Sequence, residues 1–259
     1  MNEGAAEVFG EHVEVFDGGS MGGAVRVGKT VRRPAGPWSP TIRRLLGYLR
    51  ERGITWIPQP LGVDEGGRDK VSYLAGVVPQ YPLPDWVWSD SVLVDTARYL
   101  EAFHEASKDF DSAHATWQVP AHHPVEVICH NDFAPYNMVF DDEQLRAVID
   151  WDTASPGPRV WDLAYLAYRI VPLTDPANRD GLDGSLTGRA RRLRLLCHSY
   201  GHQLDPSRVL PVAIQRLVDL ADFTEIRATG DREYLHEHAG LYRRDAIWID
   251  ANIEGLGSG

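Results

Sequence analysis

Two polar segments near the middle of the chain carry side chains suited to phosphoryl transfer. The first runs from His130 to Asn137 and contains Asp132 five residues before Asn137; in the second, Ile149-Asp150-Trp151-Asp152, Asp150 follows Asn137 by thirteen residues. A carboxylate can orient an acceptor hydroxyl and take its proton, and oxygen ligands can hold the Mg²⁺ ions that neutralise phosphates. This spacing predicts a kinase-type site, with ordinary polar loop residues as the alternative.

Apolar runs predict the strands that position these two segments. Residues 125–129, Val-Glu-Val-Ile-Cys, lead into the first segment, and residues 145–149, Leu-Arg-Ala-Val-Ile, lead into the second. Asp141-Asp142-Glu143 marks a turn between two short strands. Both segments are therefore expected in loops at strand ends.

The two segments resemble the aminoglycoside phosphotransferase and choline kinase group, the small-molecule relatives of protein kinases. That group carries H-G-D-x-x-x-x-N, then I-D-W-D or I-D-W-E, and a D-L-A shortly after. The matching residues here are His130 to Asn137, Ile149 to Asp152 and Asp162-Leu163-Ala164, with Asn131 replacing the usual glycine. The resemblance is specific over residues 125 to 168, looser before them and weak beyond Arg169.

The resemblance implies a role for each matching residue. Asp132 is expected as the catalytic base and Asn137 and Asp150 as Mg²⁺ ligands, with His130 and Asp162 supporting the catalytic loop. The implied reaction moves the γ-phosphoryl group of ATP or GTP to a hydroxyl of a small molecule.

The resemblance also implies an α+β, protein-kinase-like fold with two lobes. Residues 1–76 are expected to form a small N-lobe with an antiparallel sheet, which binds the nucleotide. Residues 77–259 are expected to form a larger, mainly helical C-lobe, which holds the catalytic and acceptor-binding groups.

A glycine-rich segment lies between two predicted strands of the first lobe. Residues 17–23, Asp-Gly-Gly-Ser-Met-Gly-Gly, let the backbone approach phosphates without interference from Cβ atoms. We expect Ser20, Gly22 and Gly23 to contact the nucleotide, with a plain hairpin turn as the alternative.

Kinases place a cation on the third strand, and two arginines are available for this role. Arg32 and Arg33 point to opposite faces of a strand, and alignment of the family's apolar-cation pair with Val31-Arg32 favours Arg32. The alternative is that both are solvated edge charges. The partner glutamate is missing, because residues 34–50 contain no acidic residue and Ile42 takes the matching position in a helix that begins at Ser39.

A hairpin and a proline-rich stretch follow. By resemblance, the backbone of Tyr73 and Leu74 is expected to meet the adenine edge. Trp86 is expected to pack under the connection between the lobes rather than cap a pocket. His104, on the apolar face of a predicted helix, is expected to be a hydrogen-bonded core histidine rather than a metal ligand.

Composition bounds the partners. The net charge of −11 disfavours nucleic acid and is compatible with a cationic acceptor, for which Asp222 and Glu225 of a C-terminal helix are candidate ligands beside a solvated-face alternative. No apolar run approaches a membrane span, and the two cysteines suit a cytoplasmic protein. The sequence selects neither the acceptor nor an oligomeric state.

Two other functions compete with a small-molecule kinase. A protein kinase is less consistent with the sequence, because Asp150-Trp151-Asp152 lacks the Phe-Gly of a regulated activation loop and little room remains before Trp161. A degenerate kinase fold that binds nucleotide or metabolite without turnover would account for the missing glutamate. The intact Asp132, Asn137 and Asp150 argue against it.

Overall fold

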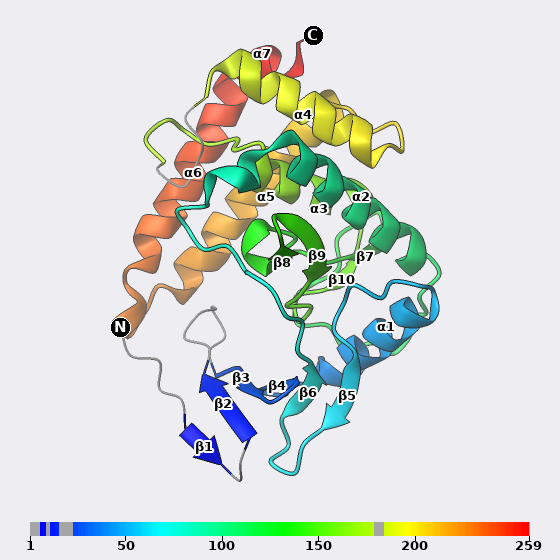
Figure 1. Cartoon of the computed structure of the whole chain (residues 1–259). Coiled ribbons are helices and arrows are strands. Elements are labelled where there is room, and N and C mark those ends of the chain that lie inside the picture. The colour runs from blue at the N-terminus through cyan, green and yellow to red at the C-terminus, as the bar shows by residue number, and fades with distance from the viewer. Residues whose placement is uncertain (1–5, 9–10, 16–22, 179–183, 259) are drawn as a thin grey trace.

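An antiparallel sheet at one end of the molecule and a group of helices at the other define its architecture (Figure 1). The structure, a computed structural model, describes residues 6–8, 11–15, 23–178 and 184–258. No helix within these ranges is long and apolar enough to cross a membrane.

The sheet has the strand order β1-β2-β3-β4-β6-β5, with every neighbouring pair antiparallel. Its strands are β1 (Ala6–Val8), β2 (Glu11–Val15), β3 (Val25–Val27), β4 (Thr30–Arg33), β5 (Pro60–Val63) and β6 (Asp69–Ser72). The predicted hairpins between the second, third and fourth strands and between the fifth and sixth are confirmed.

Helix α1 (Ser39–Glu51) packs its apolar stripe against the core, and the side chains of this stripe are almost inaccessible to solvent. Ile42, which takes the position of the missing glutamate, is 1% exposed. The helix begins at Ser39 as predicted, with Trp38 as its N-cap, and the Ser39 hydroxyl accepts a hydrogen bond from the Gly36 N–H at 2.9 Å. Pro40, which lacks an N–H, still suits the first helical turn.

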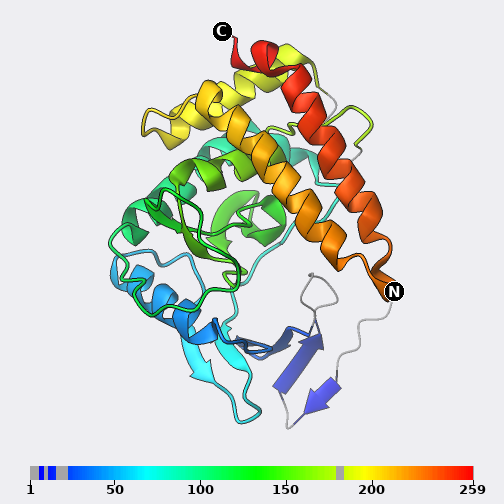
Figure 2. The same cartoon turned by 180° about the vertical axis from the view of Figure 1, so that it is seen from behind.

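The helical part surrounds two short two-stranded sheets (Figure 2). Its helices are η1 (Asp85–Trp88), α2 (Asp90–Ser107), η2 (Pro135–Asn137), α3 (Arg159–Ile170), α4 (Leu186–Tyr200), α5 (Pro206–Arg227), η3 (Gly230–Arg232), α6 (Leu235–Ala251) and α7 (Ile253–Gly257). The small sheets pair β7 (Val127–Cys129) with β10 (Ser155–Gly157) and β8 (Met138–Asp141) with β9 (Gln144–Val148). These strands carry the polar segments predicted from the sequence.

The connection between the sheet and the helices passes very close to β8. Val77 and Phe140 exchange two backbone hydrogen bonds of 2.8 Å, and Trp86 packs its ring against Phe140 at 4.9 Å, as predicted. Gly76 has φ +145°, and a Cβ atom there would lie 2.5 Å from the Phe140 carbonyl oxygen. A side chain at residue 76 therefore conflicts with both the backbone conformation and the contact.

Gly76→Ala is expected to destabilise the fold more than Gly53→Ala does. Gly53 also has a positive φ, +86°, but nothing lies within 4 Å of its Cβ position, so only backbone strain of about 1–2 kcal/mol applies. At Gly76 the clash with Phe140 adds to that strain. Urea unfolding of both variants measures the difference, and equal losses would contradict the close approach.

Candidate active site

The carboxylate of Asp162 holds the backbone at the start of the catalytic loop. It lies on α3, is fully buried, and accepts the N–H groups of His130 at 2.6 Å and Asn131 at 2.8 Å. His104 on α2 adds a third hydrogen bond from Nε2 at 3.2 Å. Asp162 thus accepts hydrogen bonds from three donors, two in the loop after β7 and one on α2.

His104 joins this carboxylate to α4. Burial lowers the pKa of His104, so the ring is neutral and, since Asp162 is an acceptor, its Nε2–H donates to Asp162. The hydroxyl of Tyr200 then donates to Nδ1 at 2.7 Å. Burial would raise the pKa of Asp162, but the hydrogen bond from His104 and nearby positive charge outweigh it and lower that pKa. The prediction of a hydrogen-bonded core histidine is confirmed.

The backbone conformation and side-chain contacts of Asn131 account for its departure from the family pattern. Its φ of 66° lies in the left-handed region, which glycine adopts without strain and asparagine tolerates better than most residues. Its amide nitrogen donates to the Thr153 carbonyl and the Ser155 hydroxyl, both at 2.8 Å. Thr153 returns a bond from its hydroxyl to the His130 carbonyl at 2.9 Å. The asparagine therefore fits the turn and also ties the loop to the segment before β10.

The carboxylate of Asp132 is oriented by two neighbouring side chains. The hydroxyl of Tyr136 donates to Oδ1 at 2.5 Å, and the amide of Asn137 donates to Oδ2 at 2.8 Å and to the Asp132 carbonyl at 2.9 Å. Because the Asn137 nitrogen is used in this way, its Oδ1 is the atom left for another partner. Asp132 and Asn137, predicted to act together, are in direct contact.

Asp150 lies beside Asn137 because of the β8–β9 hairpin. The Ile149 N–H donates to the Asn137 carbonyl at 2.9 Å, and Asp150, the next residue, adopts φ +62°. Its side chain is 52% exposed. The protein groups around the Asp150 carboxylate reduce its hydration on one side, and this raises its pKa to about 6. The negative charges of Asp152 and Asp132 add to the shift, whereas Arg33 opposes it. Crowded carboxylates and a free amide oxygen form the kind of donor set that a hard divalent cation requires.

The two arginines of β4 lie on opposite faces, and Arg33 rather than the predicted Arg32 contacts the central aspartates. Arg33 reaches Asp152 at 3.0 Å and Asp150 at 3.9 Å. Arg32 lies instead beside Asp64 at 3.8 Å. The side chain of Arg33 therefore faces the catalytic loop, and that of Arg32 faces away from it.

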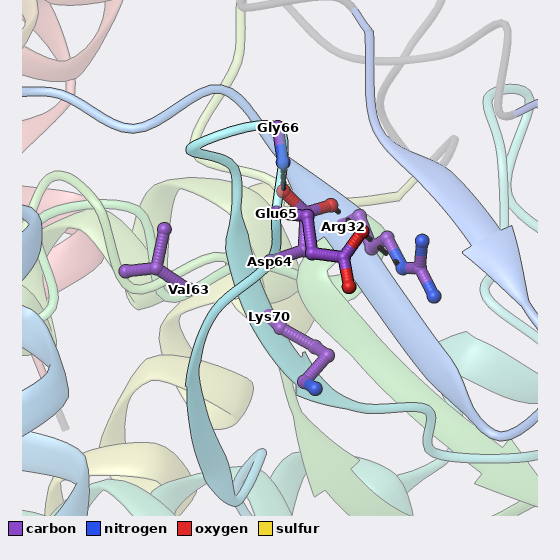
Figure 3. A pocket seen from close by; sticks show the side chains of 6 residues that line it. All are labelled: Arg32, Val63, Asp64, Glu65, Gly66 and Lys70. Carbon is purple, nitrogen blue, oxygen red and sulfur yellow. Dashed lines mark hydrogen bonds and ion pairs between the residues drawn. The ribbon is translucent and has the colours of Figure 1, made fainter.

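Arg32 lines a shallow cavity at the β5–β6 hairpin (Figure 3). This cavity has a volume of about 390 Å³ and is lined by Arg32, Val63, Asp64, Glu65, Gly66 and Lys70. None of these residues belongs to the two predicted polar segments. Arg32 is therefore placed against its own sheet rather than against the predicted site.

A carboxylate of the segment that follows β9 pairs with the strand cation in place of the missing helix glutamate. Asp152 is 8% exposed and pairs with Arg33, whose side chain is 15% exposed. Helix α1 contributes the opposite charge, since its Arg43 pairs with Asp69 of β6, which is 2% exposed. The strand cation is thus oriented by the segment that follows β9 and not by α1.

The residues predicted to contact the nucleotide are described only in part. Ser20 and Gly22 lie outside the described residues, and the Gly23 carbonyl accepts a hydrogen bond from Arg68. Tyr73 uses its N–H on the Lys29 carbonyl at 2.9 Å.

Leu74 and the two C-terminal acids complete the predicted set. The backbone of Leu74 has no hydrogen-bond partner in the described ranges. Asp222 and Glu225 are exposed, and each pairs with Arg243 at 3.2 Å; Glu225 also contacts His236 at 2.7 Å. These two acids are therefore paired with neighbours on α6.

Two residues that contact the catalytic loop were missed by sequence reasoning. Tyr136 lies inside the recognised segment, and its position immediately before Asn137 was a signal that went unused. Arg216 of α5 donates to the Asn131 carbonyl and stacks on Trp161 at 4.8 Å and Tyr165 at 4.4 Å. Its 85-residue separation from Asn131 gave no signal in the sequence.

The site combines a strand cation, a hydrogen-bonded aspartate and adjacent oxygen donors between a small sheet and a helical part, which defines a protein-kinase-like phosphotransferase. A family model described as "Phosphotransferase enzyme family" matches residues 78–196. The trifolitoxin immunity protein of Rhizobium leguminosarum bv. trifolii is 32% identical over 193 residues, which cover 71% of this chain and 72% of that protein. The chain belongs to the phosphotransferase enzyme family.

Solved structures share the fold. A spectinomycin phosphotransferase in complex with ADP and spectinomycin superposes with a TM-score of 0.63 at 12% identity, covering 94% of this chain and 93% of that one. A choline/ethanolamine kinase family protein from Mesorhizobium loti gives 0.60 at 16% identity, covering 93% and 91%. The predicted α+β, protein-kinase-like fold is confirmed.

The contribution of His104 to stability is expected to fall as the pH drops below about 6.5. Burial lowers the pKa of His104 and of His130, so the unfolded chain takes up protons in this range that the native protein does not. The free energy of unfolding then decreases by at most about 1.4 kcal/mol per pH unit for each such histidine. His104→Gln should reduce that slope, and His198→Gln, on the exposed face of α4, should not. Urea unfolding at pH 7.5, 6.5 and 5.5 measures it; an unchanged slope in His104→Gln would contradict the assignment.

Proposed function

We propose that this protein is a kinase that transfers the γ-phosphoryl group of ATP or GTP to a hydroxyl of a small molecule, with Mg²⁺. The observation that supports it most strongly is the contact of Asp132 with Asn137, which stands next to Asp150 through the Ile149–Asn137 backbone bond. Base, amide ligand and carboxylate ligand are thereby gathered on one hairpin.

In this proposal Asp132 accepts the proton of the acceptor hydroxyl. Its carboxylate already accepts a hydrogen bond from one hydroxyl, that of Tyr136 at 2.5 Å, and the amide of Asn137 fixes the other oxygen. The role of this orientation is to bring an acceptor oxygen in line with the γ-phosphorus, since positioning supplies much of the acceleration in phosphoryl transfer. The anchored backbone of His130 and Asn131 keeps Asp132 in place.

Asn137 Oδ1 and the carboxylate of Asp150 would hold Mg²⁺. Both are hard oxygen donors, and a cation between them would offset the negative charges that Asp132 and Asp152 bring close to Asp150. When bound, the ion supplies neutralisation of the charge on the transferred phosphate.

The nucleotide would lie between β4 and the connection. Arg33, held by Asp152, is the candidate for the phosphates, because a planar guanidinium can bind two oxygens at once. The backbone of Leu74, which lacks a partner among the described residues, is the candidate for the adenine edge. Gly23, with Ser20 and Gly22, remains the candidate cover over the phosphates.

The first test removes the proposed base. Asp132→Asn is expected to reduce kcat by about 10²–10⁴-fold while changing nucleotide affinity little, because the base acts on the acceptor and not on the nucleotide. Asp141→Asn, at the exposed end of β8, is the matched control and should retain full activity. Turnover is measured against a panel of hydroxylated metabolites and antibiotics. Wild-type turnover by Asp132→Asn would refute the assignment.

The second test separates the two arginines of β4. Arg33→Met is expected to weaken Mg²⁺–nucleotide binding by about 10–100-fold, which corresponds to the loss of a charged hydrogen bond of about 1.5–3 kcal/mol. Arg32→Met should change it by less than about threefold, within the effect of an exposed ion pair. Isothermal titration at a temperature where both variants are folded gives the affinities. Sensitivity of Arg32 alone would restore the register predicted from the sequence.

The same titration distinguishes a kinase from a binding module. For a kinase, Mg²⁺ should tighten nucleotide binding, and slow hydrolysis should occur without acceptor. Binding that is indifferent to Mg²⁺, with no turnover across the panel, would favour a fold that only binds its ligand.

A further inference from the structure

Arg169, in the last turn of α3, is surrounded by tyrosine rings close to the proposed base. Its guanidinium carbon lies 5.7 Å from the ring centre of Tyr81, 5.5 Å from those of Tyr136 and Tyr165, and 4.9 Å from that of Tyr168. The only hydrogen bond of this guanidinium, among the residues that the structure describes, runs from Nε to the Tyr165 hydroxyl at 3.3 Å. We refer to these five residues as the Arg169 cluster.

The half-buried Arg169 differs from the other arginines of the helical part that are not exposed. Arg192 donates to the carbonyls of Trp88 and Ile170 and to Asp90. Arg159 pairs with Glu105 at 2.7 Å. Others reach backbone carbonyls. Among the described arginines of the helical part that are not exposed, Arg169 alone has a guanidinium that contacts neither a carboxylate nor a carbonyl oxygen.

The tyrosines do not neutralise this charge. Burial raises the pKa of Tyr136, Tyr165 and Tyr168 above the ordinary range, so their phenols are uncharged. Asp245, the carboxylate bound to the Tyr168 hydroxyl, accepts hydrogen bonds from three donors and makes no ion pair with Arg169. A partly desolvated cation without a counter-ion is unfavourable, and the faces of the tyrosine rings offset this only in part.

The cluster is linked to one oxygen of Asp132. The Tyr136 hydroxyl joins Oδ1 of Asp132 to the Tyr165 hydroxyl, with bonds of 2.5 Å and 2.8 Å. The other oxygen, Oδ2, accepts a hydrogen bond from Asn137, one of the proposed metal ligands. The cluster and the proposed metal ligands therefore contact different oxygens of the proposed base.

We propose that Arg169 binds an anionic group of the acceptor, so that the acceptor is a hydroxylated acid rather than a cation. The inference rests on the proposed kinase function, because it takes Asp132 as the base. A carboxylate matches the fork of a guanidinium, and the four tyrosine rings suit an apolar or aromatic scaffold next to it. Asp222 and Glu225, expected to favour a cation, are already paired with Arg243.

The first experiment asks whether Arg169 is a structural or a ligand-binding cation, and needs no known acceptor. Arg169→Met is compared with Arg192→Met by thermal unfolding of the full chain. If the charge of Arg169 awaits a ligand, Arg169→Met should have a Tm equal to or above the wild-type value. Arg192→Met leaves Asp90 and two carbonyls without their donor, and should lower Tm on the order of 10 °C. A comparable fall in Arg169→Met would show a structural cation and overturn the proposal.

The second experiment uses matched pairs of acids and their uncharged amides. N-acetyl-L-serine, 3-hydroxybutyrate and 4-hydroxyphenylacetate are each tested beside their amides at 10 mM, with choline and ethanolamine as cationic probes. Protein saturated with Mg²⁺ and a non-hydrolysable ATP analogue is used for thermal shift, and Mg²⁺–ATP for turnover. At least one acid should raise Tm above the value measured with its amide, or give a kcat/KM at least tenfold higher than that of its amide. Arg169→Met should abolish the preference, and Arg169→Lys should keep part of it.

The possible outcomes separate this proposal from the proposed function. A preference for amides or cations, or the absence of any response to the acids, overturns the anionic acceptor. Nucleotide hydrolysis by the wild type without acceptor is recorded in parallel. Its absence counts against the kinase, whereas an Arg169-dependent response to acids in the thermal shift would still support the anion site.

Discussion

The buried carboxylate of Asp162 is the constraint on which the catalytic loop depends. A carboxylate that leaves water must be surrounded by donors, and two of those it finds are consecutive backbone N–H groups, at His130 and Asn131. That requirement sets the path of the chain immediately before Asp132. His104 supplies the remaining donor and is itself fixed by Tyr200, so α2, α3 and α4 all have to be packed correctly for the loop to take its shape.

Two of the aspartates around the loop share a nearby cation. Three aspartates, Asp132, Asp150 and Asp152, come from two segments that meet beside β4, and Arg33 is the cation that reaches two of them. The shorter contact goes to the buried Asp152, while Asp150 is left half-exposed with a raised pKa. One aspartate is thus committed to holding the cation, and the other remains available as a ligand. On the far side of Asp132 the imbalance has the opposite sign, since no acid in the described part of the chain pairs with Arg169.

The fold was predicted through the family resemblance of residues 125–168, whereas the strands and the central polar residues were predicted from local patterns. Alternating apolar runs, turn residues and the spacing of Asp132, Asn137 and Asp150 are all readable along the chain. The sequence could not show which of Arg32 and Arg33 faces the catalytic loop. A strand of four residues between turns has no internal marker of register, and a shift by one residue exchanges its two faces.

Contacts between distant segments were also out of reach. Asp152 as partner of Arg33, Arg216 on the Asn131 carbonyl and the tyrosines around Arg169 join residues that only tertiary packing brings together. Asn131 shows the intermediate case. Its departure from the family pattern was visible, but the reason, a left-handed backbone, belongs to the folded loop.

The partner chosen by Arg33 bears on how such a protein is controlled. In kinases whose strand cation pairs with a glutamate on the helix after it, displacing that helix separates the pair and switches the enzyme off. Here the partner, Asp152, is two residues from Asp150 in the same segment, and α1 is joined to the sheet by a separate pair, Arg43 with Asp69. Movement of α1 would therefore leave the Arg33–Asp152 pair itself in place, since α1 touches the sheet through Asp69, the cross-strand neighbour of Arg33. In the proposed kinase, output would then follow the supply of substrates rather than the displacement of this helix.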